Sequence, residues 1–455
     1  MFTYPYKEKE AEELQRQLWL SQNDGSRMNL VYGKHGMGKS ALVQSALSGQ
    51  GPVVNLPLGG KIDNLALEEY SACCAKQLNI FVPYSIHSFE ELLDFLFSEA
   101  WKKAFSLVLD NFQEAPKRYP TLCAHLAKKW RSEAKRTKMN LVLICGDLQA
   151  ADSIFFADDA PLRNLPGATF LIEPVGLDLL KKIQQEAAPS ALNREDNLAF
   201  YQFTGGRPEA VRLAIECGAV TKKKLLAAFL KEDSPLVRLC EKSIYSLLGK
   251  NSDTYLSILQ LVATGVQSQA EMEQHLGGII IGGHLAKLEN EYQMLRKQRP
   301  LLSSPDSRGV VRYRLQNPGL NMYFRLRFAN GGVSEENEAS TILNNFLKDD
   351  LKEYLLEKIS ESGVFTTIGS DWAASARISK KKPASAKQVA GEEDVEASAN
   401  KDIVALKGKK AMVAAVCPSE DAFNKEPFLK QIEALKKGPL KGYTIDARLF
   451  TIADV

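Results

Sequence analysis

Short apolar runs alternate with amphipathic stretches from about residue 25 to residue 175 of the chain. The apolar runs predict strands over 28–32, 52–58, 105–110, 140–145 and 168–172. The stretches between them predict helices over 41–47, 66–78, 89–104 and 119–136. Such alternation favours a mainly parallel sheet with helices on both faces, which binds ligands at the carboxyl ends of its strands. We therefore expect an α/β domain over residues 1–175.

From residue 176 onward the pattern is mainly helical and divides the rest of the chain into three parts. A small helical lid is predicted over 176–248, from helices at 177–186, 197–203 and 208–215. A winged helix-turn-helix is predicted over 249–330, from helices at 255–264, 269–275 and 281–290 and a strand at 309–315. A small α/β domain is predicted over 331–455, from a helix at 338–360, strands at 402–406 and 411–416, and a helix at 430–437. Within this last part, the lysine-, alanine- and serine-rich stretch 379–401 predicts a mobile insertion.

Composition narrows the class of protein. The chain has 455 residues, a formal net charge of +3 and seven cysteines. This charge is too small to indicate a nucleic acid partner, and apolar runs such as 141–145 are far too short to cross a bilayer. The N-terminal segment 1–10 is polar and lacks the apolar stretch of a secretory signal. The scattered cysteines form no C-x-x-C pair, which is typical of reduced thiols. We expect a cytoplasmic protein without a structural zinc site.

One motif indicates chemistry. The segment Gly33-Lys34-His35-Gly36-Met37-Gly38-Lys39-Ser40 fits the phosphate-loop pattern G-x-x-x-x-G-K-[ST], and it lies between a predicted strand and a predicted helix. Glycines let the backbone wrap closely around phosphates, the lysine neutralises the β- and γ-phosphates, and the serine hydroxyl binds Mg²⁺. The residues expected to bind ATP and Mg²⁺ here are Gly33, Lys34, His35, Gly36, Met37, Gly38, Lys39, Ser40 and Ala41. The alternative is a turn that merely uses glycine.

An acidic element follows the strand at 105–110. Asp110 ends this strand and is the predicted catalytic carboxylate, which would also bind the metal together with the loop serine. Efficient ATPases usually place a glutamate next to it, to orient the attacking water, but this chain has Asn111, so slow hydrolysis is predicted. Glu114 is the candidate substitute, and a solvated loop glutamate is the alternative. Gly146-Asp147 ends the next strand along the chain and is either a γ-phosphate sensor or an ordinary turn.

A glycine-proline break separates two predicted helices of the lid. The segment Gly205-Gly206-Arg207-Pro208 can lay backbone against adenine and direct Arg207 at a phosphate. It can equally be a helix-terminating turn, because glycine ends helices and proline begins them.

The predicted winged helix carries local positive charge. Only Asp306 opposes a set of basic residues, which are Arg296, Lys297, Arg299, Arg308, Arg312, Arg314, Arg325 and Arg327. This charge suits the phosphate backbone of double-stranded DNA. The presumed recognition helix, however, offers only His284, Lys287 and Asn290 as polar readers. Packing between domains is therefore the alternative role.

With these motifs in order, the chain resembles the archaeal-type P-loop ATPases of the signal-transducing (STAND-like) AAA+ group, from the N-terminal segment to nearly the last residue. The motifs that carry the resemblance are the phosphate loop, the strand end Asp110-Asn111-Phe112-Gln113, the Gly-Gly-x-Pro turn and the winged helix. Pro161-Leu162-Arg163-Asn164-Leu165 is similar to the Pro-Leu-x-Gly-Arg segment of that family, without its Gly-Arg ending. Asn317-Pro318 through Tyr323-Phe324-Arg325 resembles the Asp-Pro-aromatic segment that closes the winged helix there.

The resemblance also implies a C-terminal domain related to restriction-endonuclease-like nucleases. Lys401-Asp402-Ile403-Val404-Ala405 matches the first strand of such domains, but the expected Glu-x-Lys falls on Ala415-Val416-Cys417. A nuclease of this type needs clustered carboxylates for Mg²⁺ together with a lysine. We therefore expect a degenerate domain that lacks nuclease activity and docks against the ATPase or a protein partner.

Two functions remain open from the sequence. The first is a slow ATPase that acts as a nucleotide-dependent switch coupled to DNA or a protein partner. The second is a non-hydrolysing, nucleotide-stabilised scaffold or DNA-binding protein. Both predict ATP binding, and ATP turnover separates them.

Overall fold

The computed structural model describes residues 7–60, 62–188, 190–248, 252–298, 311–328, 355, 367–369, 403–417, 423–437 and 440–451. The chain divides into two compact units, Met1–Val175 with Arg207–Glu209, and Gly176–Gly206 with Ala210–Val455. The predicted helix at 338–360, apart from Leu355, and the predicted insertion at 379–401 lie outside the described residues, as does Asp402.

The first unit is built on a five-stranded parallel sheet. Its strands are β1 (Arg27–Tyr32), β2 (Val53–Pro57), β3 (Phe105–Asp110), β4 (Met139–Cys145) and β5 (Ala168–Leu171). The strand order is β2-β3-β4-β1-β5, and each neighbouring pair is parallel. All five strands end at the same edge, where β1 leads into the glycine-rich loop and β3 ends in Asp110. This is the predicted α/β fold of a P-loop NTPase.

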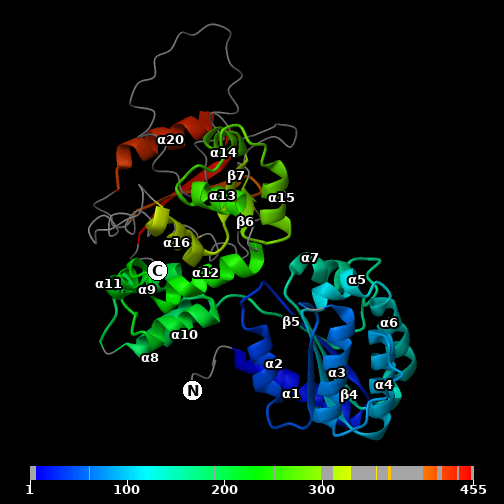
Figure 1. Cartoon of the computed structure of the whole chain (residues 1–455). Helices are drawn as coiled ribbons and strands as arrows, with labels where there is room; N and C mark the ends of the chain where they lie inside the picture. The colour runs from blue at the N-terminus through cyan, green and yellow to red at the C-terminus, as the bar shows by residue number, and fades with distance from the viewer. Residues whose placement is uncertain are drawn as a thin grey trace. The chain divides into compact units, whose positions relative to one another are not determined.

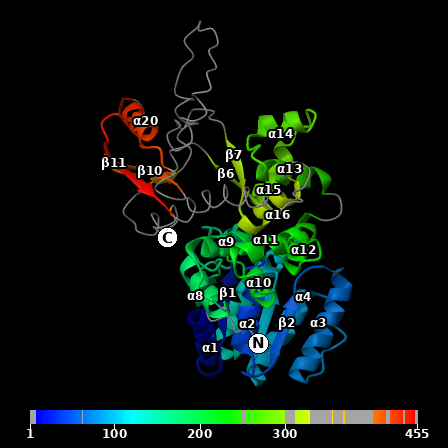
Figure 2. The ribbon, with the colours of Figure 1, turned by 90° about the vertical axis from the view of Figure 1, so that its left-hand side faces the viewer.

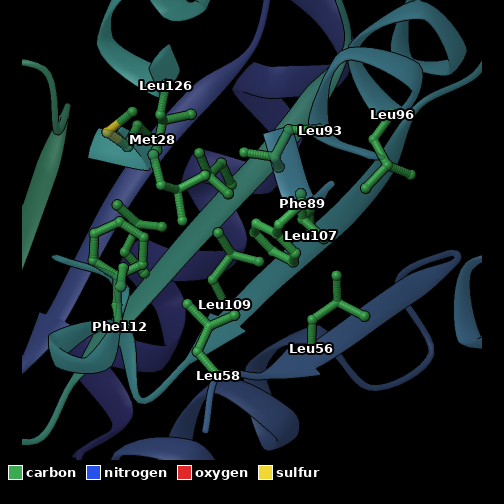
Figure 3. Close-up of a cluster of buried hydrophobic side chains, with 14 of the residues drawn as sticks. Met28, Leu56, Leu58, Phe89, Leu93, Leu96, Leu107, Leu109, Phe112 and Leu126 are labelled. Carbon is green, nitrogen blue, oxygen red and sulfur yellow. The ribbon is translucent and has the colours of Figure 1, made fainter. Parts of the chain in front are cut away.

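Helices cover both faces of this sheet (Figure 1). They are α1 (Glu8–Asn23), α2 (Lys39–Leu47), α3 (Asp63–Leu78), α4 (Phe89–Lys102), α5 (Ala115–Arg118), α6 (Leu122–Glu133) and α7 (Leu148–Ala151). Alternate residues of the strands enter two hydrophobic clusters, one shared with α1 and α2 and one with α3, α4 and α6. Figure 3 shows the second cluster, in which Phe112 packs beside Leu58 and Leu109 at the carboxyl ends of the strands. This packing fixes the turn that follows β3.

The second unit begins with a group of helices. They are α8 (Leu177–Ala187), α9 (Arg194–Thr204), α10 (Pro208–Glu216, whose first two residues belong to the first unit), α11 (Lys222–Leu230) and α12 (Pro235–Leu248). An Asn193–Asp196 capping box begins α9, and Gly205, in the left-handed conformation, ends it. Three further helices follow, α13 (Asp253–Ala263), α14 (Gln269–His275) and α15 (Gly282–Asn290), and then an antiparallel ribbon, β6 (Leu295–Gln298) with β7 (Arg312–Leu315). Helix α16 (Pro318–Phe328) comes next. The three helices and β7 lie where the sequence predicted three helices and a strand.

The C-terminal part of the second unit contains a four-stranded mixed sheet. Its strands are β8 (Thr367–Gly369), β9 (Ile403–Lys407), β10 (Lys410–Val416) and β11 (Thr444–Phe450), in the order β11-β10-β9-β8. Helix α20 (Lys425–Lys437) connects the parallel pair β10 and β11 and packs on one face of the sheet (Figure 2). On the other face, Leu177 and Leu198 of α8 and α9 join the same hydrophobic cluster as β9 and β10. None of the helices among the described residues has the length and apolar character needed to cross a membrane.

Candidate phosphate-binding site

The loop between β1 and α2 has a backbone shape that glycine adopts most easily. Gly33, Gly36 and Gly38 have φ values of 147°, 79° and 81°. A Cβ atom on Gly33 would lie 2.2 Å from the carbonyl oxygen of Ile172, the residue after β5. Gly38 caps α2, so the loop runs straight into the positive end of this helix. A helix N-terminus behind a glycine-rich loop favours a bound anion.

Lys39, the first residue of α2, is folded back onto the loop. Its side chain is buried, and its Nζ atom donates hydrogen bonds to the carbonyl oxygens of Gly33 at 2.9 Å and Lys34 at 2.7 Å. Burial lowers the pKa of Lys39 from 10.5 to about 8, and the charge of Arg207 acts in the same direction. The ammonium is therefore still charged at neutral pH, in surroundings that solvate it poorly.

Ser40 and Asp110 lie together at the carboxyl edge of the sheet. The hydroxyl of Ser40 donates a hydrogen bond of 2.7 Å to Oδ2 of Asp110, whose Oδ1 accepts one from the backbone N–H of Asn111. The two side chains come from positions 70 residues apart in the sequence. A hydroxyl beside a carboxylate is the kind of hard oxygen pair that Mg²⁺ prefers. Among the residues that the structure describes, no group of three or more His, Cys, Asp or Glu side chains could hold a metal ion.

Arg207 approaches the loop from the Gly-Gly-x-Pro turn. Its Nη2 atom donates a hydrogen bond of 2.9 Å to the carbonyl oxygen of His35, and a Cβ atom on Gly36 would lie 2.1 Å from this nitrogen. Desolvation, reinforced by the charges of Lys39 and Arg207, lowers the pKa of His35. Positive charge therefore converges on the loop, as a polyanionic ligand requires.

In the turn after β3, the side chain of Gln113 lies toward β4 and that of Glu114 toward the end of β2. Asn111 has φ 57°, in the left-handed region, which asparagine tolerates better than most residues. Oε1 of Gln113 accepts a 2.8 Å hydrogen bond from the N–H of Gly146, at the end of β4. Glu114 pairs with Lys117 at 3.3 Å and lies beside Gly59, which follows the edge strand β2. The sequence includes Gln113 in the strand-end motif but does not identify its partner, which lies 33 residues away.

The structure gives Asp147 a structural role. Its Oδ1 atom accepts hydrogen bonds from the N–H groups of Gln149 and Ala150 and so caps α7. This capping fits the ordinary turn, one of the two alternatives for Gly146-Asp147. The neighbouring Gly146 takes part in the site through its backbone instead.

Basic residues of the β6–β7 ribbon share one face. Arg296 lies opposite Arg314 and Gln298 opposite Arg312, while Tyr313 and Leu315 point to the buried side. The ring of His284, one of the three presumed readers on α15, packs at 5.0 Å against Tyr255. Arg299 and Arg308 lie outside the described residues.

Strand β10 is apolar at its end, where the resemblance led us to expect a Glu-x-Lys element. Ala414 pairs with Ile403, and Ala415 is the next residue of β10. Ala415 is fully buried and belongs to the cluster that includes Phe428 and Ile432 of α20, and Cys417 is also buried. These positions provide neither a carboxylate nor a lysine.

No protein-family model matches the sequence, and a comparison with curated proteins finds no match. Among solved structures, the Walker-type ATPase PABY2304 of Pyrococcus abyssi is 17% identical, with a TM-score of 0.48, covering 70% of this chain and 95% of that one. The ORC2 protein of Aeropyrum pernix, solved as ADPNP–ADP complexes, is 15% identical, with a TM-score of 0.46, covering 75% and 94%. Cdc6p from Pyrobaculum aerophilum is 14% identical, with a TM-score of 0.39, covering 76% and 96%.

Proposed function

We propose that this chain is an ATP-binding P-loop ATPase with slow turnover, which works as a nucleotide-dependent switch. The observation that carries the proposal is the convergence of three groups on one glycine-rich loop. Lys39 is buried against the loop carbonyls, Ser40 bonds directly to Asp110, and Arg207 reaches the loop at His35. A triphosphate replaces the carbonyl partners of Lys39 with charged oxygens, and hydrogen bonds between charged groups are the stronger kind.

Each side chain has a defined task in this proposal. Lys39 and the backbone N–H groups of the loop bind the β- and γ-phosphates, and Arg207 adds a second cation at the loop. Ser40 and Asp110 fit Mg²⁺, because a hydroxyl and a carboxylate oxygen lie 2.7 Å apart. When bound, Mg²⁺ neutralises the charge that develops on the phosphates. In hydrolysis, the oxygen of water bonds to the γ-phosphorus, the bond to the β–γ bridging oxygen breaks, and ADP, inorganic phosphate and a proton are released.

The switch is proposed from the place of Arg207 in the chain. Arg207 follows α9 after Gly205 and Gly206, both of which have positive φ. In the second unit, Leu198 and Tyr201 of α9 pack in the cluster that contains β9 and β10. A ligand that competes for Arg207 therefore acts on the end of a helix that is part of the core of the second unit. Such a local electrostatic change biases a larger element in known nucleotide switches.

Phosphate release tests this proposal. Purified protein with ATP and Mg²⁺ is compared with Lys39→Ala, and ATP affinity is measured separately by calorimetry. We expect binding and slow release in the wild type, and neither in Lys39→Ala. Unchanged ATP affinity in Lys39→Ala contradicts the assignment of the phosphate loop.

The second candidate function is a scaffold that binds ATP without hydrolysing it. Asn111 stands where a water-orienting glutamate is usual, and Glu114 pairs with Lys117. Neither position 111 nor position 114 therefore offers an unpaired carboxylate to orient the attacking water. Tight ATP binding with no phosphate release in the same assay favours this function.

We also propose weak binding of double-stranded DNA through the β6–β7 ribbon. The support is the set of arginines on one face, Arg296, Arg312 and Arg314. Substituting Arg312→Glu and Arg314→Glu should lower the affinity and flatten the log–log salt dependence by about 0.9 for each phosphate that the protein no longer neutralises. Arg238→Glu on α12 is the matched control, because this exposed arginine is not part of the ribbon and pairs with Asp233. Absence of binding at low salt favours the packing role of this part.

A further inference from the structure

A chain of hydrogen bonds runs along the carboxyl edge of the first sheet, from the turn after β3 to the phosphate loop. Oε1 of Gln113 accepts the N–H of Gly146 at 2.8 Å, and the preceding carbonyl, that of Cys145, accepts the N–H of Gly33 at 3.2 Å. Nε2 of Gln113 makes a long contact of 3.5 Å with Oδ1 of Asn111. Gln113 is the side chain that joins the two ends of this path.

The strand pairing explains why such a link matters. Strand β4 lies between β3 and β1, and the β3–β4 pairing ends at Leu109 and Leu143. The β4–β1 pairing continues to Cys145 and Tyr32. Asp110 is thus one residue beyond the last pair that ties its strand to β4. A side-chain bond from the turn to Gly146 then ties Asp110 to the strand that supports the loop.

Gln113 and its neighbour Glu114 reach in opposite directions along this edge. Gln113 bonds to the end of β4, which is the strand next to β1 and the phosphate loop. Glu114 lies beside Gly59 after β2, on the other side of β3, and pairs with Lys117. Two contacts fix the backbone of the turn after β3, to which both residues belong. Phe112 is fully buried beside Phe155, and the N–H of Glu114 bonds to the carbonyl of Asn111.

We propose that Gln113 is a positioning residue for ATP hydrolysis, which holds Asp110 and Asn111 at a fixed spacing from the phosphate loop. This inference rests on the proposed ATPase function and identifies Gln113, not Glu114, as the residue of this turn on which turnover depends. The physical reason is that misplacing a group by about 1 Å can cost about 10²-fold in rate while binding changes little. Gly146 allows the close approach, because a Cβ atom there would lie 3.3 Å from Nε2 of Gln113.

The first test measures the hydrogen bond itself, in nucleotide-free protein. Amide hydrogen exchange at Gly146 is compared between wild type, Gln113→Met and Gln113→Glu. Methionine has a similar length and no comparable acceptor, so exchange at Gly146 should become about 2- to 10-fold faster. Gln113→Glu keeps an acceptor oxygen and should retain protection. Equal exchange in all three proteins refutes the Gln113–Gly146 link, whether or not the chain binds ATP.

The second test separates positioning from general stability. We expect ATP affinity in Gln113→Met to stay within about 3-fold of wild type while turnover falls about 10- to 100-fold. Gln113→Glu should keep at least the wild-type turnover. The matched control is Gln50→Met, at an exposed glutamine after α2, which should change neither quantity, and Glu114→Gln tests the other candidate residue of this turn. If Gln113→Met does not fold, Gln113→Asn replaces it, because it keeps the amide and shortens its reach by one methylene.

Each remaining outcome has a distinct meaning. An equal loss of affinity and turnover in Gln113→Met, or a loss of turnover in Glu114→Gln, overturns the inference. Wild-type protein that binds ATP but releases no phosphate also overturns it and favours the scaffold function. Wild-type protein that binds no ATP refutes the proposed function itself, and the exchange measurement at Gly146 still decides whether the link exists.

Discussion

Replacing Lys39 with methionine is expected to stabilise the nucleotide-free protein while it abolishes ATP binding. Lys39 is 7% exposed, and its ammonium is held by the backbone carbonyls of Gly33 and Lys34. A site built for a polyanion is thus charged and poorly solvated before the ligand arrives. Methionine fills a similar volume and carries no charge.

The lowered pKa gives the size of the effect. A lysine whose pKa falls from 10.5 to about 8 on folding loses roughly 3 kcal/mol of preference for its charged form. The methionine variant leaves the carbonyl oxygens of Gly33 and Lys34 without this donor. This loss offsets about 1 kcal/mol of the stability that is gained by removing the charge. We expect the free energy of unfolding to rise by about 1 to 2 kcal/mol at neutral pH.

The same shift predicts a pH dependence of known sign. Between about 8, the pKa in the folded protein, and 10.5, the ordinary lysine value, the unfolded chain binds more protons than the folded one. The stability of the wild type therefore gains a rising contribution with pH in this window. The methionine variant lacks that contribution. Its advantage is complete below about pH 8 and shrinks as the pH approaches 10.5.

Urea unfolding at about pH 7 and about pH 10 measures both effects. Thermal unfolding with and without ATP·Mg²⁺ measures binding, since a ligand at 100 times its Kd stabilises by about 2.7 kcal/mol. Lys102→Met is the matched control, because this lysine is exposed at 69% and pairs with Glu99 on the surface. A methionine variant that is less stable than wild type at neutral pH, or that is still stabilised by ATP, refutes the reasoning.

Three other substitutions or assays test separate parts of the molecule. Asn111→Asp places a carboxylate in the turn after β3, where aspartate tolerates the backbone φ of 57°, and should raise the rate of phosphate release by up to about 10²-fold. An unchanged rate with normal ATP binding excludes residue 111 as the group that orients the attacking water. Gly33→Ala should lower the free energy of unfolding in urea by at least about 2 kcal/mol and remove ATP binding, because its Cβ would lie 2.2 Å from the carbonyl oxygen of Ile172. The control Gly49→Ala, at φ 73° with open space around it, should lower it by only about 1 kcal/mol of backbone strain. Linear and supercoiled DNA incubated with Mg²⁺ or Mn²⁺, with or without ATP, should remain intact, and cleavage that disappears in Asp402→Ala would show that other acids complete a working site.

Local sequence patterns were sufficient to identify the phosphate loop and most of the framework around it. The spacing of Gly33, Gly38, Lys39 and Ser40 is local, and the apolar runs that form β1 to β5 are recognisable one segment at a time. Both signals lie within a few residues and are independent of the rest of the chain. The sequence also indicated Asp110 as the partner of the loop, because a buried strand ending in a carboxylate is recognisable without its neighbours.

Which side chains meet depended instead on the tertiary arrangement. Strand β4 separates β3 from β1, and this order gives Gln113 its partner Gly146, 33 residues away. Arg207 reaches the carbonyl of His35 across 172 residues. Between β1 and β4, the buried amides of Asn29 and Asn140 bond at 2.8 Å across 111 residues. Such contacts follow from strand order and from the path of the chain between distant segments. The periodicity within one segment encodes neither the strand order nor the path of the chain, because it fixes which face of an element is buried and not which element lies against that face.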